Sequence, residues 1–327
     1  MFYAICAALC LAVMFLAFAG LVILSIPALR ILDLMARAVK PKTTANLLFI
    51  IRLLPLAIAV LVSAGLALPA FLEFEPHSTR EMLDWPLLLL AGLGLGAALT
   101  ITVRLGQMLY TTRSLRRQWS SAGSQLPVTI TDVPVYCVDG ELSLLAVTGI
   151  FRPRIFVSSD VARALTNDEL AAALRHELAH VGASDNLKQL LLKISRPPRW
   201  LRSFGRADLA WTNASEIAAD ENALARGVSA LELSSALIKV GRLSIGRVMP
   251  APLAASHLVP CECGSATMAR AAHLRQLLEN GAPEEGIDGP LRAHRLAIAG
   301  AAMLAVYLAA LGTLLPAIHN LLEFLVR

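Results

Sequence analysis

Charged residues are scarce in this chain. Asp, Glu, Lys and Arg make up 16% of its 327 residues, whereas hydrophobic residues make up 56%. Soluble domains usually carry about a quarter charged residues, so the composition argues against an ordinary soluble protein. Charge is absent altogether from four long stretches, at residues 1–29, 53–72, 85–103 and 296–322. A helix needs about 20 apolar residues to cross a bilayer, so these stretches predict four transmembrane helices, with four buried core helices as the alternative.

Three further absences narrow the class of protein. No Lys or Arg precedes the first apolar stretch, which is also longer than the core of a signal peptide, so we expect it to be retained as a membrane span. Two of the five cysteines lie in that span and three in a region that we expect to be cytoplasmic, so a disulfide scaffold is not expected. The sequence has no basic patch interleaved with aromatic residues, so nucleic-acid binding is not expected. The net charge of +5 is explained by basic loops that face anionic membrane lipids.

The distribution of basic residues between the loops predicts the orientation of the spans. The loop at residues 30–46 is basic, whereas the loop at residues 73–84 is acidic apart from Arg80. Basic residues also follow the third apolar stretch and precede the fourth. The positive-inside rule therefore predicts an extracytoplasmic N-terminus and loop 73–84, with loop 30–46 and a domain at 111–291 in the cytoplasm. Transmembrane helices are expected at residues 1–29, 47–72 and 85–110, and a fourth with a short tail at 292–327, in the inner (cytoplasmic) membrane.

The expected cytoplasmic domain has a strand-rich first part and a helical second part. Short β-branched runs bounded by Pro, Gly and Asp predict strands at residues 126–131, 133–138 and 154–158. Thr166 and Glu169 form a capping-box pattern that opens a helix ending near residue 182. Further helices are expected at residues 207–226, 230–246 and 267–279. The sequence thus predicts an α-helical integral membrane protein that carries a cytoplasmic α+β domain.

The first of these helices contains a His-Glu-x-x-His pattern, in the stretch LRHELAHVGASDN. At about 100° per residue, His176 and His180 lie within roughly 40° of each other on the helix, with Glu177 beside them, and the leucines cluster on the far side. Two imidazoles one turn apart are typical zinc ligands, and the glutamate is then the general base of a metallopeptidase. The alternative is a pair of hydrogen-bonded core histidines, which does not explain why Glu177 shares their face.

A hydrolytic zinc site usually needs a third protein ligand, which we expect from a later helix. Glu216 and Asp220 lie one turn apart on one face, among alanines that allow close helix approach. We predict that Glu216 binds the metal and that Asp220 hydrogen-bonds a ligand histidine and fixes its tautomer. Asp185 is a second candidate for that supporting role. The alternatives are solvated carboxylates, or a capping pair in which Asn213 occupies Glu216.

Three further hypotheses concern the surroundings of this site. Four residues could stabilise the oxyanion of a tetrahedral intermediate: His257, His273, Arg270 and Tyr136. An extended substrate could pair with the predicted strand at 154–158. Cys261 and Cys263 could bind a metal together with His257, but their spacing matches no familiar closed zinc site, and a polar loop is the simpler interpretation.

The run TGIFRPRIFVSSDVARALTNDELAAALRHELAH, followed by Asp185 and SEIAADENAL, resembles the BlaR/MecR-type membrane metallopeptidases over about residues 148–224. The order of three spans, zinc domain and fourth span is also similar. The resemblance implies a gluzincin-type zinc metalloprotease domain in which His176, His180 and Glu216 bind Zn²⁺ and Glu177 is the catalytic base. Because only five residues follow Leu322, we expect the C-terminal penicillin-binding sensor of that family to be absent. The HtpX/Ste-type membrane proteases share a similar motif pair, but the span layout and FRPRIFVS favour the first family.

The leading functional prediction is a membrane-embedded zinc endopeptidase that cleaves a cytoplasmic protein, a repressor-type regulator, in signal transduction. One alternative is an HtpX/Ste-like protease for membrane-protein quality control. Another is a non-enzymatic membrane module that zinc only stabilises. The presence of Glu177 argues against the non-enzymatic module, because a purely structural zinc site does not require a general base. The expected partners are the protein substrate and membrane lipids, without direct binding of nucleic acid.

Overall fold

The computed structural model describes residues 2–35, 40–75, 84–128, 130–139, 145–198, 201–244, 255–257 and 264–280. The chain divides into two compact units. Among the described residues, one unit contains 2–30, 50–75 and 84–102, and the other contains the described parts of 31–49 and 103–280. The fourth expected span, at 292–327, lies outside the described residues, as do Cys261 and Cys263.

The first unit is built from long apolar helices. Helix α1 is Phe2–Met35, and α2 (Pro41–Val62) continues through a π-helical turn at Ser63–Ala67 into α3 (Leu68–Phe74). Helix α4 is Trp85–Ala122. Among the described residues, three helical segments are long and apolar enough to cross a membrane: Phe2–Arg30, Pro41–Phe74 and Trp85–Ala122, with mean hydropathies of 2.8, 2.6 and 2.0. They coincide with three of the four expected spans and indicate a membrane protein.

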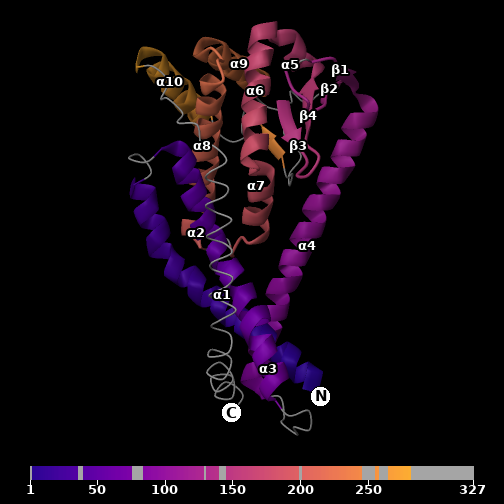
Figure 1. The fold of residues 1–327 in the computed structure, drawn as a ribbon, viewed down its shortest axis with the longest axis vertical. Helices are drawn as coiled ribbons and strands as arrows, with labels where there is room; N and C mark the ends of the chain where they lie inside the picture. The colour runs from indigo at the N-terminus through magenta and orange to yellow at the C-terminus, as the bar shows by residue number, and fades with distance from the viewer. Residues whose placement is uncertain are drawn as a thin grey trace. The chain divides into compact units, whose positions relative to one another are not determined.

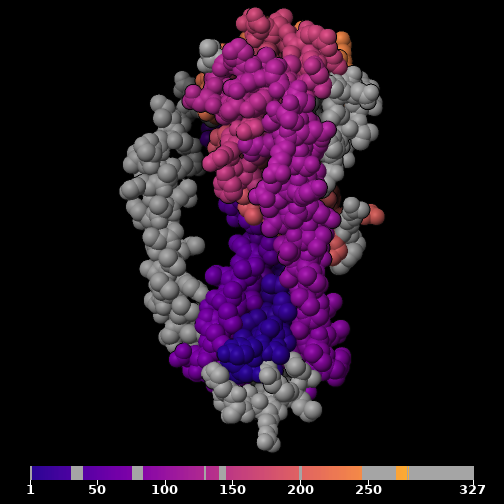
Figure 2. Space-filling model, turned by 90° about the vertical axis from the view of Figure 1, so that its right-hand side faces the viewer, coloured from indigo at the N-terminus to yellow at the C-terminus, as the bar shows by residue number. Residues whose placement is uncertain are grey.

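Small and polar residues let these helices approach one another. The Ser63 hydroxyl donates to the Cys10 carbonyl at 2.7 Å. A Cβ at Gly94 would collide with the Leu11 carbonyl, so α4 lies against α1 at that point. Phe71 of α3 is buried in one cluster with residues of α1. Figure 2 shows the indigo residues of α1 side by side with the violet residues of the following helices. Small residues at helix contacts are typical of packing inside a bilayer.

The second unit contains a five-stranded sheet with the order β1-β2-β4-β3-β5. The strands are β1 (Ser124–Leu126), β2 (Val135–Val138), β3 (Leu145–Thr148), β4 (Arg154–Ser158) and β5 (Ala255–His257). All neighbouring strands are antiparallel except β2 and β4, which are parallel. Strand β4 therefore has partners on both sides. The hypothesis that a substrate pairs with residues 154–158 is wrong, because the backbone groups of this strand already bond to β2 and β3.

Two of the predicted strands have different bounds, and two strands were not predicted. The expected strand at 126–131 is replaced by β1, which ends at Leu126 because Pro127 has no N–H to donate to a ladder. The next strand begins only at Val135, after Pro134. Strands β3 and β5 had no distinct signal in the sequence. The tight turn between β3 and β4 begins at Gly149, whose φ of +97° is a conformation that other residues rarely adopt.

The two faces of this sheet are covered by different helices, because side chains alternate along each strand. Val147 and Ile155 face a core that includes residues of α5 (Ser159–Ala164), α6 (Asn167–Ala183) and α9 (Ala230–Ser244). Ala146 and Phe156 face the other way and pack with Trp119 near the end of α4. Figure 1 shows α6 between the sheet and α8 (Arg202–Ala225).

The helices of the second unit follow the predicted order. Helix α6 begins with the predicted capping box, in which the Thr166 hydroxyl accepts from the Glu169 N–H and the Glu169 carboxylate accepts from the Thr166 N–H. It ends at Ser184, whose left-handed φ of 57° turns the chain sharply into α7 (Asp185–Ile194), a helix that was not predicted separately. Helix α10 is Gly264–Asn280. Helix α8 begins at Arg202, so Asn213 lies within it, and the proposed capping pair of Asn213 with Glu216 is wrong.

Candidate metal centre

Helix α6 turns its apolar side to the sheet and its polar side to α8. Leu174 is buried in the core beneath the sheet, with Leu178 packed against the same core. His176 and His180 are also buried, with 0% and 3% of their surfaces exposed. The ring centroids of the two histidines are 4.8 Å apart and the planes are nearly perpendicular. The spacing of four residues therefore places both imidazoles on one face of the helix, as expected.

Glu216 on α8 brings its carboxylate to these two imidazoles. The Nε2 atoms of His176 and His180 are 3.2 Å apart. Oε2 of Glu216 lies 3.5 Å from Nε2 of His176, and Oε1 lies 3.6 Å from Nε2 of His180. The close approach of α8 is possible because small residues such as Ala219 and Ala223 are buried on this side of the helix. Glu216 itself is 6% exposed.

Each histidine is held from behind by a different aspartate. Nδ1 of His176 lies 2.8 Å from Oδ1 of Asp220, one turn after Glu216 on α8. Nδ1 of His180 lies 2.7 Å from Oδ2 of Asp185, which the sharp turn between α6 and α7 brings back toward the ring. A carboxylate at Nδ1 accepts the proton of that nitrogen and orients the ring, so that Nε2 is the nitrogen directed at a metal, the arrangement typical of metal-binding histidines.

Arg270 on α10 supplies a positive charge beside this cluster. Its Nε and Nη2 donate to the two carboxylate oxygens of Asp220 at 2.9 and 2.7 Å. Its Nη1 lies 2.8 Å from Oε2 of Glu216, and its Nη2 lies 3.4 Å from Nε2 of His176. Arg270 is 3% exposed. The guanidinium thus fixes both α8 carboxylates through a planar fork that a lysine could not reproduce.

Burial and charge oppose each other at these groups. Burial by itself lowers the pKa of an imidazole, but the charge of Asp220 and the hydrogen bonds to Asp220 and Glu216 outweigh it and raise the pKa of His176 to about 9. Burial likewise raises the pKa of a carboxyl, but Arg270 and His180 hold the pKa of Glu216 below its usual value. The carboxylates of Glu216 and Asp220 therefore stay ionised beside Arg270 and the histidines.

Glu177 lies next to His176 on α6 and is fully buried, with 0% of its surface exposed. Its charge contributes to the electrostatics of the centre. Burial lowers the pKa of Arg270, but Asp220, Glu216 and Glu177 together raise it above the ordinary value of a guanidinium. Glu177 therefore belongs to the same electrostatic cluster as the groups around the two histidines.

The remaining candidates from the sequence are placed differently. His273 lies 3.2 Å from the Glu221 carboxylate, away from the two site histidines. Tyr136 stacks on Phe156 on the face of the sheet opposite α6. His257 belongs to β5, of which only the backbone is described. Arg270 is thus the one oxyanion candidate that reaches the centre among the side chains that the structure describes. Its fork on Asp220 was not predicted, although a lone arginine in the small-residue run ATMARAA was a possible signal.

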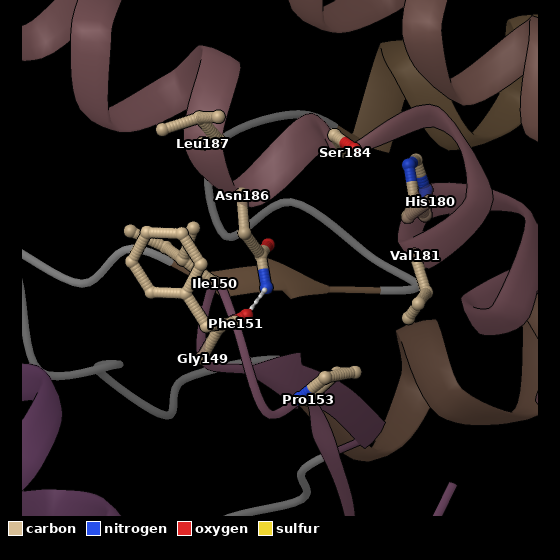
Figure 3. Close-up of a pocket in the computed structure, with 9 residues that line it drawn as sticks. All are labelled: Gly149, Ile150, Phe151, Pro153, His180, Val181, Ser184, Asn186 and Leu187. Atoms are coloured by element: carbon tan, nitrogen blue, oxygen red, sulfur yellow. Dashed lines mark hydrogen bonds between the residues drawn. The ribbon is translucent and has the colours of Figure 1, made fainter. Parts of the chain in front are cut away.

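A cavity of about 200 Å³ opens beside the second histidine. Figure 3 shows it between the turn at residues 149–153 and the junction of α6 with α7. His180 forms part of its wall. The Asn186 amide donates to the carbonyls of Val147 and Gly149, at 3.3 and 3.0 Å, and so ties α7 to the end of β3. The centre therefore has a preformed hollow next to one of its imidazoles.

The donor atoms can be tested against the requirements of zinc. Tetrahedral bonds of about 2.0–2.1 Å place two ligand atoms about 3.3 Å apart. One ligand atom from each of His176, His180 and Glu216 lies within 4.8 Å of the others, and the two Nε2 atoms are 3.2 Å apart. Two imidazoles and one carboxylate are a common donor set for zinc in hydrolases, and both rings carry the supporting carboxylates that such sites need. The residues therefore fit a zinc ion.

Comparison with known proteins supports the same chemistry. Residues 113–231 match the model of Peptidase family M48. The matched segment contains His176, His180 and Glu216 and ends before Arg270. No curated protein matches the chain. The match covers less than half of the chain and supports a metallopeptidase function for this segment.

Proposed function

We propose that this protein is a membrane-embedded zinc endopeptidase with its centre at the interface of α6 and α8. The observation that carries the proposal is the convergence of the buried side chains of His176, His180 and Glu216, each of which offers one ligand atom within 4.8 Å of the others. Two imidazoles and a carboxylate are a donor set typical of zinc in hydrolases. His176, His180 and Glu216 would hold the metal. When bound there, zinc polarises a peptide carbonyl and lowers the pKa of a water molecule.

Glu177 is the proposed general base. It takes a proton from the attacking water and later delivers that proton to the amine of the leaving group. Its burial beside His176 excludes bulk water, which strengthens its electrostatic interactions with the reacting groups. Asp220 and Asp185 act through the two histidines by orienting their rings. Arg270 acts through Glu216 and Asp220, because its donors are already directed at those carboxylates.

The finer proposal concerns place and substrate. Basic residues in the loop at 30–46 and around the domain at 111–291 favour a cytoplasmic centre and an extracytoplasmic N-terminus. The likeness of residues 148–224 to the BlaR/MecR-type metallopeptidases favours a cytoplasmic, repressor-type regulator as substrate and a role in signal transduction.

Replacing Glu177 with Gln tests the proposed chemistry. The full-length Glu177→Gln protein in lipid nanodiscs should hold about one zinc ion per chain, like the wild type. It should cleave unfolded casein at least about 100-fold more slowly, because the base is lost. Glu221→Gln on α8 is the control, since Glu221 contacts His273 and not the centre. Wild-type protein without zinc, or cleavage by Glu177→Gln at the wild-type rate, would contradict the proposal.

A comparison of cells tests the proposed role. Proteomes of cells that express the wild type or Glu177→Gln should differ in the cleavage of one or a few cytoplasmic regulators. Stabilisation of many misfolded membrane proteins in the variant would instead favour the quality-control alternative.

A further inference from the structure

The cavity beside His180 has the lining of a binding pocket for an apolar group. Its walls carry five apolar side chains, from Ile150, Phe151, Pro153, Val181 and Leu187. Among the described residues that line it, none is Asp, Glu, Lys or Arg. An ionic group would lose its hydration there without meeting a carboxylate, ammonium or guanidinium group, which is unfavourable. The cavity is therefore suited to a hydrocarbon side chain.

The size of the cavity sets the size of its occupant. A cavity of about 150 Å³ in a protein core is enough to hold a benzene molecule. The cavity here, at about 200 Å³, accommodates a side chain of the size of leucine, methionine or phenylalanine.

The walls of the cavity are held in place before anything binds. Gly149 starts the turn with a φ of +97°, and Ser184 closes the opposite wall with a φ of 57°. Asn186 joins the two walls through its hydrogen bonds to the carbonyls of Val147 and Gly149. A rigid pocket binds a side chain with little loss of its own conformational entropy. The geometry therefore favours selective binding over loose contact.

Phe151 is the most exposed of the apolar residues in the wall. Its side chain is 92% exposed, so the folded state gains little by burying it. Figure 3 shows its ring on the turn, across the cavity from His180 and Val181. A large apolar group in this place can close over an incoming side chain and become buried itself.

We propose that this cavity is the specificity pocket of the peptidase and that it binds a large apolar side chain of the substrate next to the bond that is cut. The proposal rests on the proposed function, because His180 joins the pocket to the catalytic centre. Phe151 forms the outer wall, and Ile150 forms the wall nearest to it along the turn.

Three proteins test the pocket: the wild type, Phe151→Ala and Ile150→Trp. Leu231→Ala is the matched control, because Leu231 is a similarly exposed apolar residue (68%) on α9, outside the cavity. The bonds that each protein cuts in unfolded casein are identified by mass spectrometry. The wild type and Leu231→Ala should prefer Leu, Met or Phe at one position beside the cut. Replacing that residue with Gly in a peptide should lower kcat/KM by about 10- to 100-fold, because burial of the side chain is lost.

The variants should change the preference in different directions. Phe151→Ala should reduce the discrimination between the Leu and Gly peptides to a fewfold, with an unchanged Tm. Ile150→Trp should fill the cavity and shift the preference toward Ala or Gly. Both variants cutting casein with the wild-type preference would overturn the proposal while leaving the peptidase function intact.

A binding measurement separates the pocket from the chemistry. Full-length, zinc-loaded Glu177→Gln protein is irradiated with a peptide that carries p-benzoylphenylalanine between glycines. Cross-links should fall within residues 149–153 and 181–187, and an excess of the corresponding leucine peptide should suppress them. Cross-links elsewhere would overturn the pocket proposal even if the wild type cleaves no peptide. Cross-links in the cavity without any wild-type cleavage would instead contradict the proposed function alone.

Discussion

Replacing Arg270 with Met should strongly destabilise the second unit. Methionine keeps much of the length of the side chain but removes the guanidinium that contacts Asp220 at 2.7 and 2.9 Å and Glu216 at 2.8 Å. Two buried carboxylates then lose their cation, and breaking a buried pair in this way costs about 3–5 kcal/mol. For a domain of this size, 1 kcal/mol shifts Tm by about 2–4 °C, so Tm should fall by about 6–20 °C.

Tryptophan fluorescence during heating measures this shift on the full-length protein in nanodiscs with a chelator present. Arg275→Met is the control, because Arg275 lies on the same helix with its side chain 81% exposed and pairs with Glu279 at the surface. Its Tm should change by less than about 2 °C. In an Asp220→Asn background, Arg270→Met should lower Tm by less than it does in the wild type, because only Glu216 then loses its counter-charge. A fall in Tm of less than 2 °C for Arg270→Met would refute the assignment of this arginine as the counter-charge.

Three other substitutions have defined outcomes. Asp185→Asn should weaken zinc binding about 10- to 100-fold in a chelator competition, because His180 loses the carboxylate that orients it. Glu169→Gln keeps the capping geometry but removes the negative charge. Burial by itself raises the pKa of Glu169, but hydrogen bonds from Lys239 and Ser235 outweigh burial and lower the pKa from 4.5 to about 2. The variant should be about 1–3 kcal/mol less stable at pH 7, and the difference should vanish as pH falls from 4.5 to 2. Gly149→Ala should cost about 1–2 kcal/mol, since its φ is +97°.

Each of these three predictions can be contradicted by a specific result or checked against a control. Unchanged zinc affinity in Asp185→Asn would show that the aspartate does not orient the ring. A stability difference for Glu169→Gln that grows below pH 4.5 would reverse the sign expected for a carboxyl with a lowered pKa. For Gly149→Ala the control is Gly182→Ala on α6, where a Cβ meets nothing within 4 Å, and which should be neutral or slightly stabilising.

Local sequence patterns predicted much of the candidate site. The four-residue spacing of His176 and His180 determines their common face in any α-helix, and a capping box marks where that helix begins. Glu216 and Asp220 were predictable as a pair for the same reason. That these two helices lie against each other follows from the need of the imidazoles for polar partners, together with the small residues that allow close approach.

Features that depend on distant parts of the chain could not be predicted in the same way. Arg270 lies 50 residues after Asp220, and no local pattern connects the two. The strand order could not be predicted either, because β3 and β5 are short and have weak sequence signals. Strand β5 pairs with β3, which is distant in the sequence. The cavity beside His180 requires the turn after β3 and the kink at Ser184 to meet, which only the folded backbone determines.

The position of Arg270 has a practical consequence for isolating the proteolytic part of this chain. The segment recognisable as peptidase stops at residue 231, whereas the guanidinium that neutralises Glu216 and Asp220 comes from α10, Gly264–Asn280. A fragment trimmed to the recognisable segment would keep the candidate zinc ligands but leave two acidic groups in its interior without their counterion. A soluble catalytic fragment should therefore extend to residue 280 at least.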